Sequence, residues 1–543
     1  MKKLPLGLTD FKTIVSENYF YTDKTMLIDE LLQDGAQVTL FTRPRRFGKT
    51  INMSMIQHFF DVEEGAENRK LFEGLAVGKT DSMKEQGKYP VIFISMKDVK
   101  TQNFTDCINE IKIIIKELFR KNKNIYSQLD EFDSDDFKKI MSGDININEL
   151  GNSLKFLNRL LSSHYKEKAI ILIDEYDTPL VSAYENSYYD EAIVFFKNLY
   201  SSAMKDNEYL KFGVMTGILR IAKEGIFSGL NNLLVKSIMD KKYSQYFGFT
   251  EEETLSAVEE YGLGDMMEGV RKWYNGYTFG NTRIYNPWSI INFLSKKELC
   301  SYWVNSSGNS LINDILARAG EDIFNDLEKL FKEESIEKYV EMVSDFHSLK
   351  DPKEIWHLLL HSGYLTTTGS TDGKRYHLRV PNNEVLDFFD TAFITKFLYS
   401  YDNFDDSIRL LKKGKIEEFG RELQKIMLNS YSCFDTSRDE KYYHVFVLGV
   451  ISLMRDEYYI DSNRESGYGR YDLYLEPKDK TKLGYIFEFK TAEKEEELEK
   501  KAEEALKQIE EKQYDASMKE HGIKNIIKIG MSFCGKKLYM KTN

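Results

Sequence analysis

Residues Arg43–Thr50 (RPRRFGKT), near the N-terminus, could bind the phosphates of a nucleotide. They follow a short run of strand-forming residues, Val38–Phe41, and precede a helical pattern that begins at Ile51. A tight loop that opens a helix with Gly-Lys-Thr presents backbone N–H groups to an anion. The lysine reaches the β- and γ-phosphates, and the threonine hydroxyl can bind Mg²⁺. The loop departs from G-x-x-x-x-G-K-[ST] because Arg43 replaces the first glycine, so the interpretation needs a second motif.

A strand-like run that ends in two carboxylates provides this second motif. Residues 168–175 (KAIILIDE) are apolar up to Asp174 and Glu175. Such a run is typical of a buried parallel strand, and open α/β sheets bind ligands at the carboxyl ends of their strands. We predict that Asp174 holds Mg²⁺, directly or through water, and that Glu175 orients and deprotonates the attacking water. The alternative is a buried strand followed by a solvated acidic turn.

Another strand-like run, Phe212–Met215, is followed by Thr216 and Arg220. P-loop ATPases place a polar residue that senses the γ-phosphate at this strand end, and Arg220 has the position of an arginine finger or sensor. The alternative is a strand-end turn with a solvated arginine. The residues predicted to bind the nucleotide are Arg43, Arg45, Arg46, Phe47, Gly48, Lys49, Thr50, Asp174 and Thr216.

Several longer stretches make the chain resemble a known group of proteins. They are Tyr21–Thr25 (YTDKT), the Arg43–Thr50 loop, Leu172–Asp177 (LIDEYD), Met215–Arg220 (MTGILR), Tyr285–Ser289 (YNPWS) and Gly467–Asp472 (GYGRYD). In these stretches, which extend nearly from end to end, the chain resembles bacterial AAA-ATPase-like proteins that carry a C-terminal PD-(D/E)XK nuclease-like domain. The resemblance implies a P-loop ATPase with a helical lid, in which arginine at position 43 is a family trait. It does not imply a cellular role.

A second group of charged residues lies near the C-terminus, on two strand-like segments, Arg470–Leu475 and Tyr485–Lys490. Because side chains alternate along a strand, Glu488 and Lys490 share one face, and Asp472 on the adjacent strand can meet them. This is the Asp…Glu-x-Lys layout of PD-(D/E)XK nucleases. In that layout two carboxylates hold one or two Mg²⁺ ions and the lysine positions or activates the nucleophile. The predicted catalytic residues of the chain are Glu175, Arg220, Asp472, Glu488 and Lys490.

Further residues resemble supporting positions of related nucleases. Glu440 and His444 share one face of an apolar helix that runs to about Met454, and they resemble the acidic and histidine positions of the first nuclease helix. The alternative for His444 is a structural histidine on a core-facing helix. Gln508 and Tyr514, on and after an amphipathic helix, resemble the later motif that supports the active site. The predicted metal-binding residues are Thr50, Asp174, Asp472, Glu488, Glu440 and His444.

The elements that must position these residues divide the chain into four predicted parts. Residues 1–240 alternate helical patterns with strand-like runs, of which Val91–Ile94 is a further one, and this is typical of a doubly wound α/β domain with a parallel sheet. Residues 241–348 are predominantly helical, with Asn286 as an N-cap before Pro287, and the resemblance identifies them as the lid. Residues 401–543 are predicted to form the restriction-endonuclease-like α/β domain with the PD-(D/E)XK layout.

Residues 349–400 are interpreted as a connector. A helix at 354–362 precedes a strand at Tyr364–Thr368, a glycine-containing turn and a second strand at Arg375–Val380. A helix with a two-stranded wing predicts a winged-helix-like fold. The helix that begins after Pro381 is acidic, which favours a structural role over DNA binding.

Composition excludes several classes of protein. With 543 residues, 42% of them apolar, and only 8 prolines, the chain can form several globular domains and is not disordered. A net charge of -12 disfavours nonspecific coating by nucleic acid, although a local basic groove is compatible with it. The four scattered cysteines lack C-x-x-C spacing, which argues against a zinc site and fits a reducing compartment. No apolar run approaches the ~20 residues that span a bilayer, so we predict a cytoplasmic protein without a membrane partner.

These residues together predict an ATP-binding and ATP-hydrolysing switch coupled to a metal-dependent nuclease that cleaves phosphodiesters of DNA or RNA. Its expected cofactors are ATP and Mg²⁺, with Mn²⁺ as an alternative ion at the nuclease site, and a homo-oligomer is compatible with the sequence. The rival interpretation is a signalling or scaffold ATPase whose nuclease-like domain only binds nucleic acid or protein. Intact Asp472, Glu488 and Lys490 favour cleavage, whereas the acidic net charge favours the rival.

Overall fold

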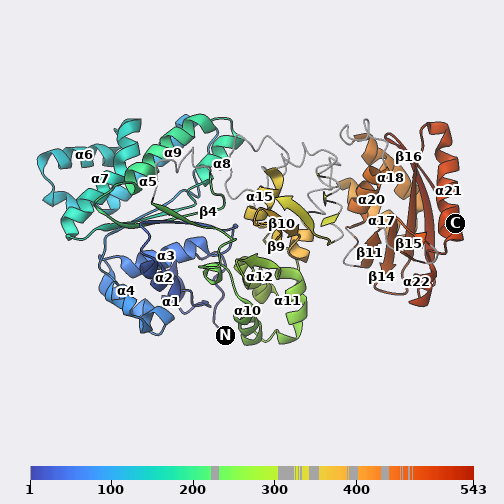
Figure 1. Cartoon of the computed structure of the whole chain (residues 1–543), viewed down its shortest axis with the longest axis horizontal. Coiled ribbons are helices and arrows are strands. Elements are labelled where there is room, and N and C mark those ends of the chain that lie inside the picture. Colours follow the sequence, from blue (N-terminus) through green and yellow to red (C-terminus); the bar gives the residue numbers. More distant parts are fainter. Residues whose placement is uncertain are drawn as a thin grey trace. The chain divides into compact units, whose positions relative to one another are not determined.

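The computed structural model describes residues 2–221, 232–303, 354–387, 402–429 and 469–543, with shorter stretches at 323, 326–327, 329–330, 333–340, 389, 440–452, 454, 457–462 and 465–466. The chain divides into two units (Figure 1). The N-terminal unit holds Met1–Ile312 and Glu337–Glu384, and the C-terminal unit holds Asn313–Ile336 and Val385–Asn543. The division of the sequence into four parts stays a prediction.

A parallel sheet forms the centre of the N-terminal unit. Its described strands have the order β2-β3-β4-β1-β5, and all neighbours run parallel. The strands are β1 (Val38–Thr42), β2 (Val91–Ser95), β3 (Ala169–Asp174), β4 (Leu210–Gly217) and β5 (Leu233–Lys236). β1 and β3 are buried along their whole length, as continuous apolar runs predict. The predicted parallel sheet is confirmed. Of its five described strands, the sequence pattern missed only the short edge strand β5.

Helices cover both faces of this sheet, so it is doubly wound, as predicted. Figure 1 shows one set of helices below the sheet and a second set above it. The lower set comprises α1 (Phe11–Ser16), α2 (Met26–Asp34), α3 (Lys49–Phe60) and α4 (Gly65–Phe72). The upper set comprises α5 (Phe104–Lys121), α6 (Glu131–Ser142), α7 (Ile147–Tyr165), α8 (Thr178–Glu185) and α9 (Tyr189–Met204).

Helices and a short hairpin follow the sheet along the chain. They are α10 (Glu251–Glu260), α11 (Met267–Tyr274), β6 (Tyr277–Phe279), β7 (Thr282–Ile284) and α12 (Pro287–Lys296). α12 begins as predicted: the side chain of Asn286 accepts hydrogen bonds from the N–H groups of Trp288 and Ser289, and Pro287 lies in the first turn.

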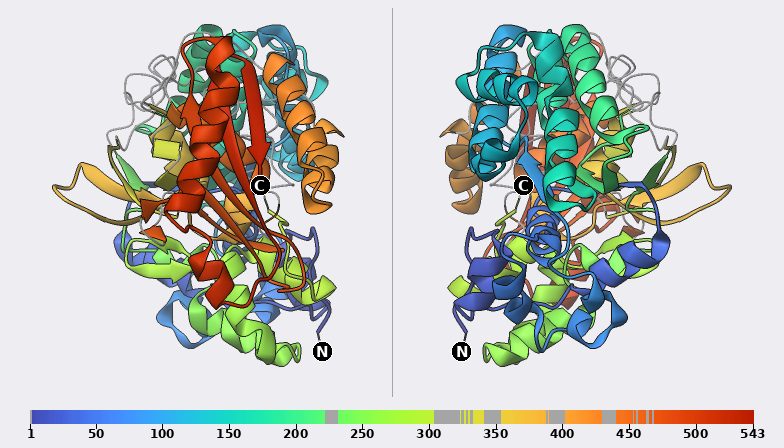
Figure 2. Two further views of the ribbon diagram at one scale, coloured as in Figure 1. Left: turned by 90° about the vertical axis from the view of Figure 1, so that its right-hand side faces the viewer. Right: turned by 90° about the vertical axis from the view of Figure 1, so that its left-hand side faces the viewer.

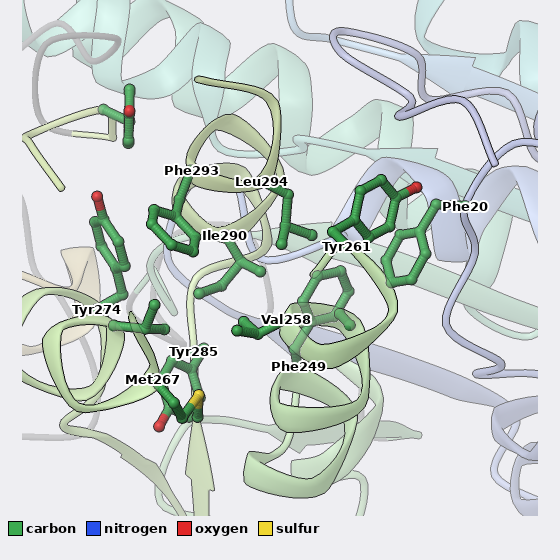
Figure 3. Packing of buried hydrophobic residues seen from close by; sticks show 13 residues of the cluster. Phe20, Phe249, Val258, Tyr261, Met267, Tyr274, Tyr285, Ile290, Phe293 and Leu294 are labelled. Atoms are coloured by element: carbon green, nitrogen blue, oxygen red, sulfur yellow. The ribbon is translucent and has the colours of Figure 1, made fainter. Parts of the chain in front are cut away.

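The buried core of this helical segment is rich in aromatic side chains (Figure 3). Phe20, from the N-terminal segment, packs edge-on against Phe249 and Tyr261, with ring centroids 6.2 and 5.8 Å apart. Burial of such large apolar rings is a strong contribution to stability. The start of the chain is therefore part of the core of the predicted lid.

A helix and a hairpin follow in the N-terminal unit. α15 (Ile355–Ser362) precedes β9 (Thr366–Ser370) and β10 (Arg375–Arg379), and β8 (Ile336–Tyr339) completes a sheet of order β8-β10-β9. The expected helix and two-stranded wing are thus present. Residues 383–387 are helical, as expected after Pro381, and most of the rest of that predicted helix lies outside the described residues.

The C-terminal unit contains a mixed sheet whose described strands have the order β11-β14-β15-β16-β17. They are β11 (Tyr458–Ser462), β14 (Leu473–Pro477), β15 (Gly484–Thr491), β16 (Ile526–Cys534) and β17 (Lys537–Thr542). β15 and β16 run parallel, and the other neighbours run antiparallel. β14 and β15 correspond to the two strands that the sequence predicted at Arg470–Leu475 and Tyr485–Lys490.

Each face of this sheet is covered by helices. α17 (Asp402–Lys412), α18 (Ile416–Asn429) and α20 (Glu440–Ser452) lie beside one face in Figure 1, whereas α21 (Leu498–Glu511) crosses the other face, as Figure 2 shows. The Tyr485 hydroxyl donates to the Leu411 carbonyl of α17. On the α21 face, Tyr474 and Ile486 pack with Ile509 of α21.

In the described part of the chain, no helix is long and apolar enough to cross a bilayer. Cys107, Cys300 and Cys534 are free thiols, and Cys433 lies outside the described residues.

Candidate active sites

The predicted phosphate loop connects β1 to α3 and contains two residues with left-handed backbone. Arg46 has φ 66° and Gly48 has φ 84°, and Gly48 is the N-cap of α3. Glycine adopts this conformation without steric cost, which explains its place immediately before Lys49. The Phe47 ring is fully buried against Tyr277, with centroids 5.0 Å apart. The structure thus places Phe47, which we predicted to bind the nucleotide, in the core that anchors the loop.

Lys49, the first residue of α3, is buried within the loop, with 4% of its surface exposed. Its Nζ donates to the carbonyl oxygens of Arg43 at 3.0 Å and Pro44 at 2.8 Å. Burial lowers the pKa of this ammonium, and nearby carboxylates, chiefly that of Glu175, act in the opposite direction. The loop therefore carries a fixed, desolvated cation, which recognition of the β- and γ-phosphates requires.

Asp174, at the carboxyl end of β3, joins side chains from two other elements. Its Oδ2 accepts a hydrogen bond from Thr50 Oγ1 of α3 at 2.8 Å, and its Oδ1 accepts one from Thr216 Oγ1 of β4 at 2.5 Å. Thr216 reaches the carboxylate because β4 lies between β1 and β3 in the sheet. Burial raises the pKa of Asp174, whereas the two hydroxyl donors lower it. A hydroxyl and a carboxylate in contact form a donor set that fits Mg²⁺, so Thr50 and Asp174 would hold this ion.

Glu175 follows Asp174 with a strained backbone. Its φ of 53° is in the left-handed region, which costs a residue other than glycine on the order of 1 kcal/mol. The Glu175 N–H donates to Thr216 Oγ1 at 3.3 Å, and its Oε2 accepts a hydrogen bond from Thr178 Oγ1 at 3.2 Å. The Thr216 hydroxyl is thus in contact with both members of the acidic pair.

The structure does not bring the guanidinium of Arg43 to the mouth of the loop. This side chain is fully buried, and its Nη1 donates to the carbonyls of Thr42 and Lys236, each at 2.8 Å. The guanidinium lies 4.9 Å from the centroid of the Phe247 ring, and burial lowers the pKa of Arg43 to about 9. The backbone of Arg43 is not left-handed, which explains why the position does not require glycine. Arg43 therefore connects β1 to β5. Its side chain has this structural role in place of the predicted contact with the phosphates.

The other predicted arginines are more exposed. Arg45 is partly buried, and its carbonyl accepts a hydrogen bond from Trp303 Nε1 at 3.1 Å. Arg46 is exposed, with its guanidinium 4.3 Å from the centroid of a Trp288 ring. Arg220 is partly exposed and follows the end of β4. Their roles toward a nucleotide stay predictions.

Asp177 is a buried carboxylate to which the sequence analysis gave no role. Its Oδ2 accepts hydrogen bonds from the N–H groups of Ile218 and Leu219, each at 2.8 Å. Burial raises the pKa of Asp177, whereas these two donors lower it. The available signal was the Leu172–Asp177 stretch, in which a third carboxylate follows the acidic pair closely.

Glu488 lies on β15 of the C-terminal sheet, and Asp472 directly precedes the adjacent strand β14, which begins at Leu473. The register pairs Leu473 of β14 with Phe487 of β15, and Asp472 Oδ2 accepts a hydrogen bond from the N–H of Phe489 at 2.7 Å. The Asp472 carboxylate is therefore fixed beside the backbone that carries Glu488, on the hairpin that the sequence predicted.

Glu488 is 3% exposed and is held by two side chains. Lys490 Nζ lies 3.7 Å from Glu488 Oε1, and Gln508 of α21 donates from Nε2 to the same oxygen. Gln508 Nε2 also donates to the Tyr514 hydroxyl at 3.3 Å. The structure thus brings together Glu488, Lys490, Gln508 and Tyr514, as the resemblance implied for the last two.

The structure does not bring His444 to these carboxylates. His444 lies on α20, and its ring packs against that of Phe489, with centroids 5.6 Å apart. Phe489 follows Glu488 directly along β15, so the two side chains point to opposite faces of the sheet. His444 is therefore on the face away from Glu488, where a core-facing histidine was the alternative.

The remaining predicted metal ligand is Glu440. The side chain of Glu440 lies outside the described residues, as do Gly467 and Tyr468. Among the side chains that the structure does describe, no three carboxylate, imidazole or thiol groups gather into a metal site. Asp472 and Glu488 still offer the carboxylate oxygens that Mg²⁺ or Mn²⁺ prefers, so these two residues would hold the ion.

Two separate parts of this chain match known protein families. Residues 5–227 match the family described as predicted AAA-ATPase, and residues 438–543 match the PD-(D/E)XK nuclease superfamily. A protein described as "uncharacterized protein in vnfD 5′ region", from Azotobacter chroococcum mcd 1, is 27% identical over 405 residues, which cover 73% of this chain and 71% of that protein. A Walker-type ATPase of Pyrococcus abyssi has a structure that matches with a TM-score of 0.38 and 13% identity, over 69% of this chain and 96% of that chain.

The two family matches fall on the two sites in the order in which the sites occur. The first covers the phosphate loop and the strands β1 to β4, and the second covers the mixed sheet with Asp472 and Glu488. The resemblance seen in the sequence is thereby confirmed. An N-terminal region that matches the predicted AAA-ATPase family is thus followed in this chain by a C-terminal region that matches the PD-(D/E)XK nuclease superfamily.

Proposed function

We propose that the N-terminal unit binds ATP and hydrolyses it in the presence of Mg²⁺. The observation that carries the proposal is the Asp174 carboxylate, which accepts hydrogen bonds from Thr50 at the start of α3 and from Thr216 at the end of β4. These groups meet beside Lys49 at the carboxyl edge of a parallel sheet, where open α/β folds bind ligands. The match of residues 5–227 to the AAA-ATPase-like family supports the same activity.

Each residue of this site has a separate task in the proposed reaction. Lys49 exchanges its loop carbonyl partners for oxygens of the β- and γ-phosphates. Thr50 and Asp174 would hold Mg²⁺, which neutralises charge on these phosphates when it is bound. Glu175 orients the attacking water and accepts its proton, and Thr216, whose Oγ1 lies 3.3 Å from the Glu175 nitrogen, senses the γ-phosphate.

For the C-terminal unit we propose cleavage of nucleic-acid phosphodiesters with Mg²⁺ or Mn²⁺. Asp472 and Glu488 would hold the ion, which lowers the pKa of a bound water and polarises the scissile phosphate. Lys490, whose Nζ is 3.7 Å from Glu488 Oε1, turns toward that water and positions it. Gln508 keeps the Glu488 carboxylate oriented through its own hydrogen bond.

One observation favours the rival function, in which the nuclease-like domain only binds nucleic acid or protein. Glu488 is already paired with Lys490 and bonded by Gln508, and the described side chains form no group of three potential metal ligands. A carboxylate balanced by an ammonium attracts a divalent cation less strongly. The rival function keeps the ATPase and removes the cleavage.

The coupling of the two activities is also part of the proposal. ATP binding or hydrolysis would switch the C-terminal unit between states with different activity on nucleic acid. We further propose that the protein is cytoplasmic and that it can form a homo-oligomer. The proposed substrate is DNA or RNA.

The test uses the purified full chain with Mg²⁺, Mn²⁺ or a chelator, with and without ATP, on a panel of DNA and RNA substrates. We expect metal-dependent release of phosphate from ATP and metal-dependent fragmentation of at least one class of nucleic acid. ATP hydrolysis without cleavage in every condition would support the rival function. Absence of ATP hydrolysis would refute the proposal for the N-terminal unit.

A further inference from the structure

The segment that leaves β4 is fastened to the residue pair Tyr176–Asp177, which directly follows Glu175. Asp177 is 2% exposed, and its Oδ2 accepts hydrogen bonds from the N–H groups of Ile218 and Leu219 at 2.8 Å each. A buried carboxylate is stable only when such donors compensate its lost hydration. Asp177 therefore fixes the first turn of backbone beyond β4.

Tyr176 holds the same segment from its other end. Its hydroxyl donates to the Leu219 carbonyl at 2.7 Å and accepts a hydrogen bond from the Ile221 N–H at 3.2 Å. Arg220 lies between these two residues, so its backbone is bonded on both sides. The Tyr176 ring is fully buried, which leaves its hydroxyl little freedom to move.

Glycine at position 217 allows the close approach of the two segments. A Cβ on Gly217 would lie 2.6 Å from Cε1 of Tyr176 and 2.7 Å from Oδ1 of Asp177, closer than atoms in contact can be. The Tyr176 N–H donates to the Thr216 carbonyl at 2.9 Å, and the Tyr200 hydroxyl donates to the Tyr176 carbonyl at 3.0 Å. The contact is therefore part of a rigid, fully bonded junction.

We propose that Tyr176 and Asp177 are positioning residues for ATP hydrolysis, because they hold the backbone that carries Arg220 in a fixed place relative to Thr216 and Glu175. The inference rests on the proposed ATPase function and deepens it. An arginine stabilises charge in a transition state only when it is already oriented, since reorganisation during the reaction removes most of the benefit. Tyr176 and Asp177 themselves touch neither substrate nor metal in this proposal.

The experiment is a double-mutant cycle on phosphate release, with Asp177→Asn, Arg220→Ala and the double variant in the full chain. Arg220→Ala is expected to lower kcat about 100-fold. Asp177→Asn is expected to lower kcat about 10-fold or more in the wild-type background, and less than about 2-fold when Arg220 is already alanine. The Kd for ATP should change less than about 3-fold, because Lys49 keeps its hydrogen bonds to the Arg43 and Pro44 carbonyls.

Tyr176→Phe repeats the test if Asp177→Asn does not fold. Tyr176→Phe removes one hydroxyl. It should lower kcat in the wild-type background, and this effect should disappear in the Arg220→Ala background. Tyr274→Phe is the matched control, because the buried Tyr274 hydroxyl likewise donates to a carbonyl (Cys300, 2.9 Å) and accepts an N–H (Cys300, 3.1 Å). It should lower the melting temperature to a similar extent and leave kcat unchanged.

The outcomes separate this inference from the function on which it rests. If the wild type releases no phosphate, the proposed ATPase fails. If the wild type is active but Asp177→Asn lowers kcat by the same factor with and without Arg220, or has no effect at all, the residues are merely structural and only this inference is overturned.

Discussion

The two acidic sites of this chain are assembled in different ways. At Asp174, both carboxylate oxygens accept hydrogen bonds from neutral hydroxyl groups, those of Thr50 and Thr216. At Glu488, one oxygen accepts a hydrogen bond from Gln508 and lies 3.7 Å from the ammonium of Lys490. The first carboxylate is bonded by neutral donors, and burial raises its pKa while the charge of Lys49 acts to lower it, whereas the second lies directly beside the ammonium of Lys490.

This difference indicates how each site responds to its metal. A divalent ion near Asp174 has to displace only hydroxyl donors, one of which, Thr50, is itself an oxygen ligand. An ion near Glu488 meets a carboxylate whose Oε1 already lies 3.7 Å from the ammonium of Lys490. We therefore infer that the N-terminal site is preorganised, and that the charge of Lys490 weakens the attraction of Glu488 for a metal ion at the C-terminal site.

The largest expected effect comes from Asp472→Ala, which should reduce nucleic-acid cleavage below detection and leave ATP hydrolysis unchanged. The variant removes a carboxylate ligand, so the bound water returns toward its ordinary pKa and the nucleophile is lost. Gel assays of cleavage and phosphate-release assays on the same protein make the measurement. Lys490→Ala should behave alike, because the attacking water loses its positioned cation. Cleavage at the wild-type rate in Asp472→Ala would mean that the activity comes from elsewhere.

Lys49→Ala should weaken ATP binding about 100-fold or more, because it removes a desolvated cation from the phosphate loop. Calorimetric titration of ATP with Mg²⁺ into the full chain measures the change. Cleavage by the C-terminal unit without ATP should stay at the wild-type level, which tests whether the two sites are chemically separate. Unchanged affinity for ATP would transfer the phosphate-binding role to the arginines of the loop.

A smaller effect is expected from Arg43→Gly, although this change restores the usual phosphate-loop pattern. It removes a buried side chain that bonds the Thr42 and Lys236 carbonyls, so the free energy of unfolding should fall by about 3 kcal/mol. Chemical denaturation measures it, with Arg46→Ala as the exposed control that should change stability by less than about 0.5 kcal/mol. Loss of ATP affinity without loss of stability would show that Arg43 contacts the phosphates after all.

The sequence predicted the parts of the fold that local pattern determines. The apolar runs of β1, β2, β3 and β4 gave the parallel sheet, and alternation along β14 and β15 gave the hairpin with Asp472 and Glu488. The meeting of Thr50, Asp174 and Thr216 could also be anticipated, because parallel strands end at the same edge of a sheet.

Side-chain directions that depend on distant partners could not be predicted. The Arg43 side chain points into the core because it contacts the Phe247 ring and donates a hydrogen bond to the carbonyl of Lys236 there. The sequence of the loop does not indicate these distant partners. Helical spacing grouped Glu440 with His444, but spacing does not say which face of the sheet a helix covers. The ring of His444 consequently meets Phe489 instead of the carboxylates.

The central claim is that the Asp174–Glu175 edge of the parallel sheet hydrolyses ATP, and phosphate release by Glu175→Gln tests it most directly. The amide keeps the shape of the side chain and its contact with Thr178 but cannot accept the proton of the water. We predict that the variant binds ATP with Mg²⁺ as tightly as the wild type does, and that its rate of phosphate release is reduced about 100-fold or more. Phosphate release at the wild-type rate would contradict the account and make Glu175 a strained strand-end residue without a part in catalysis.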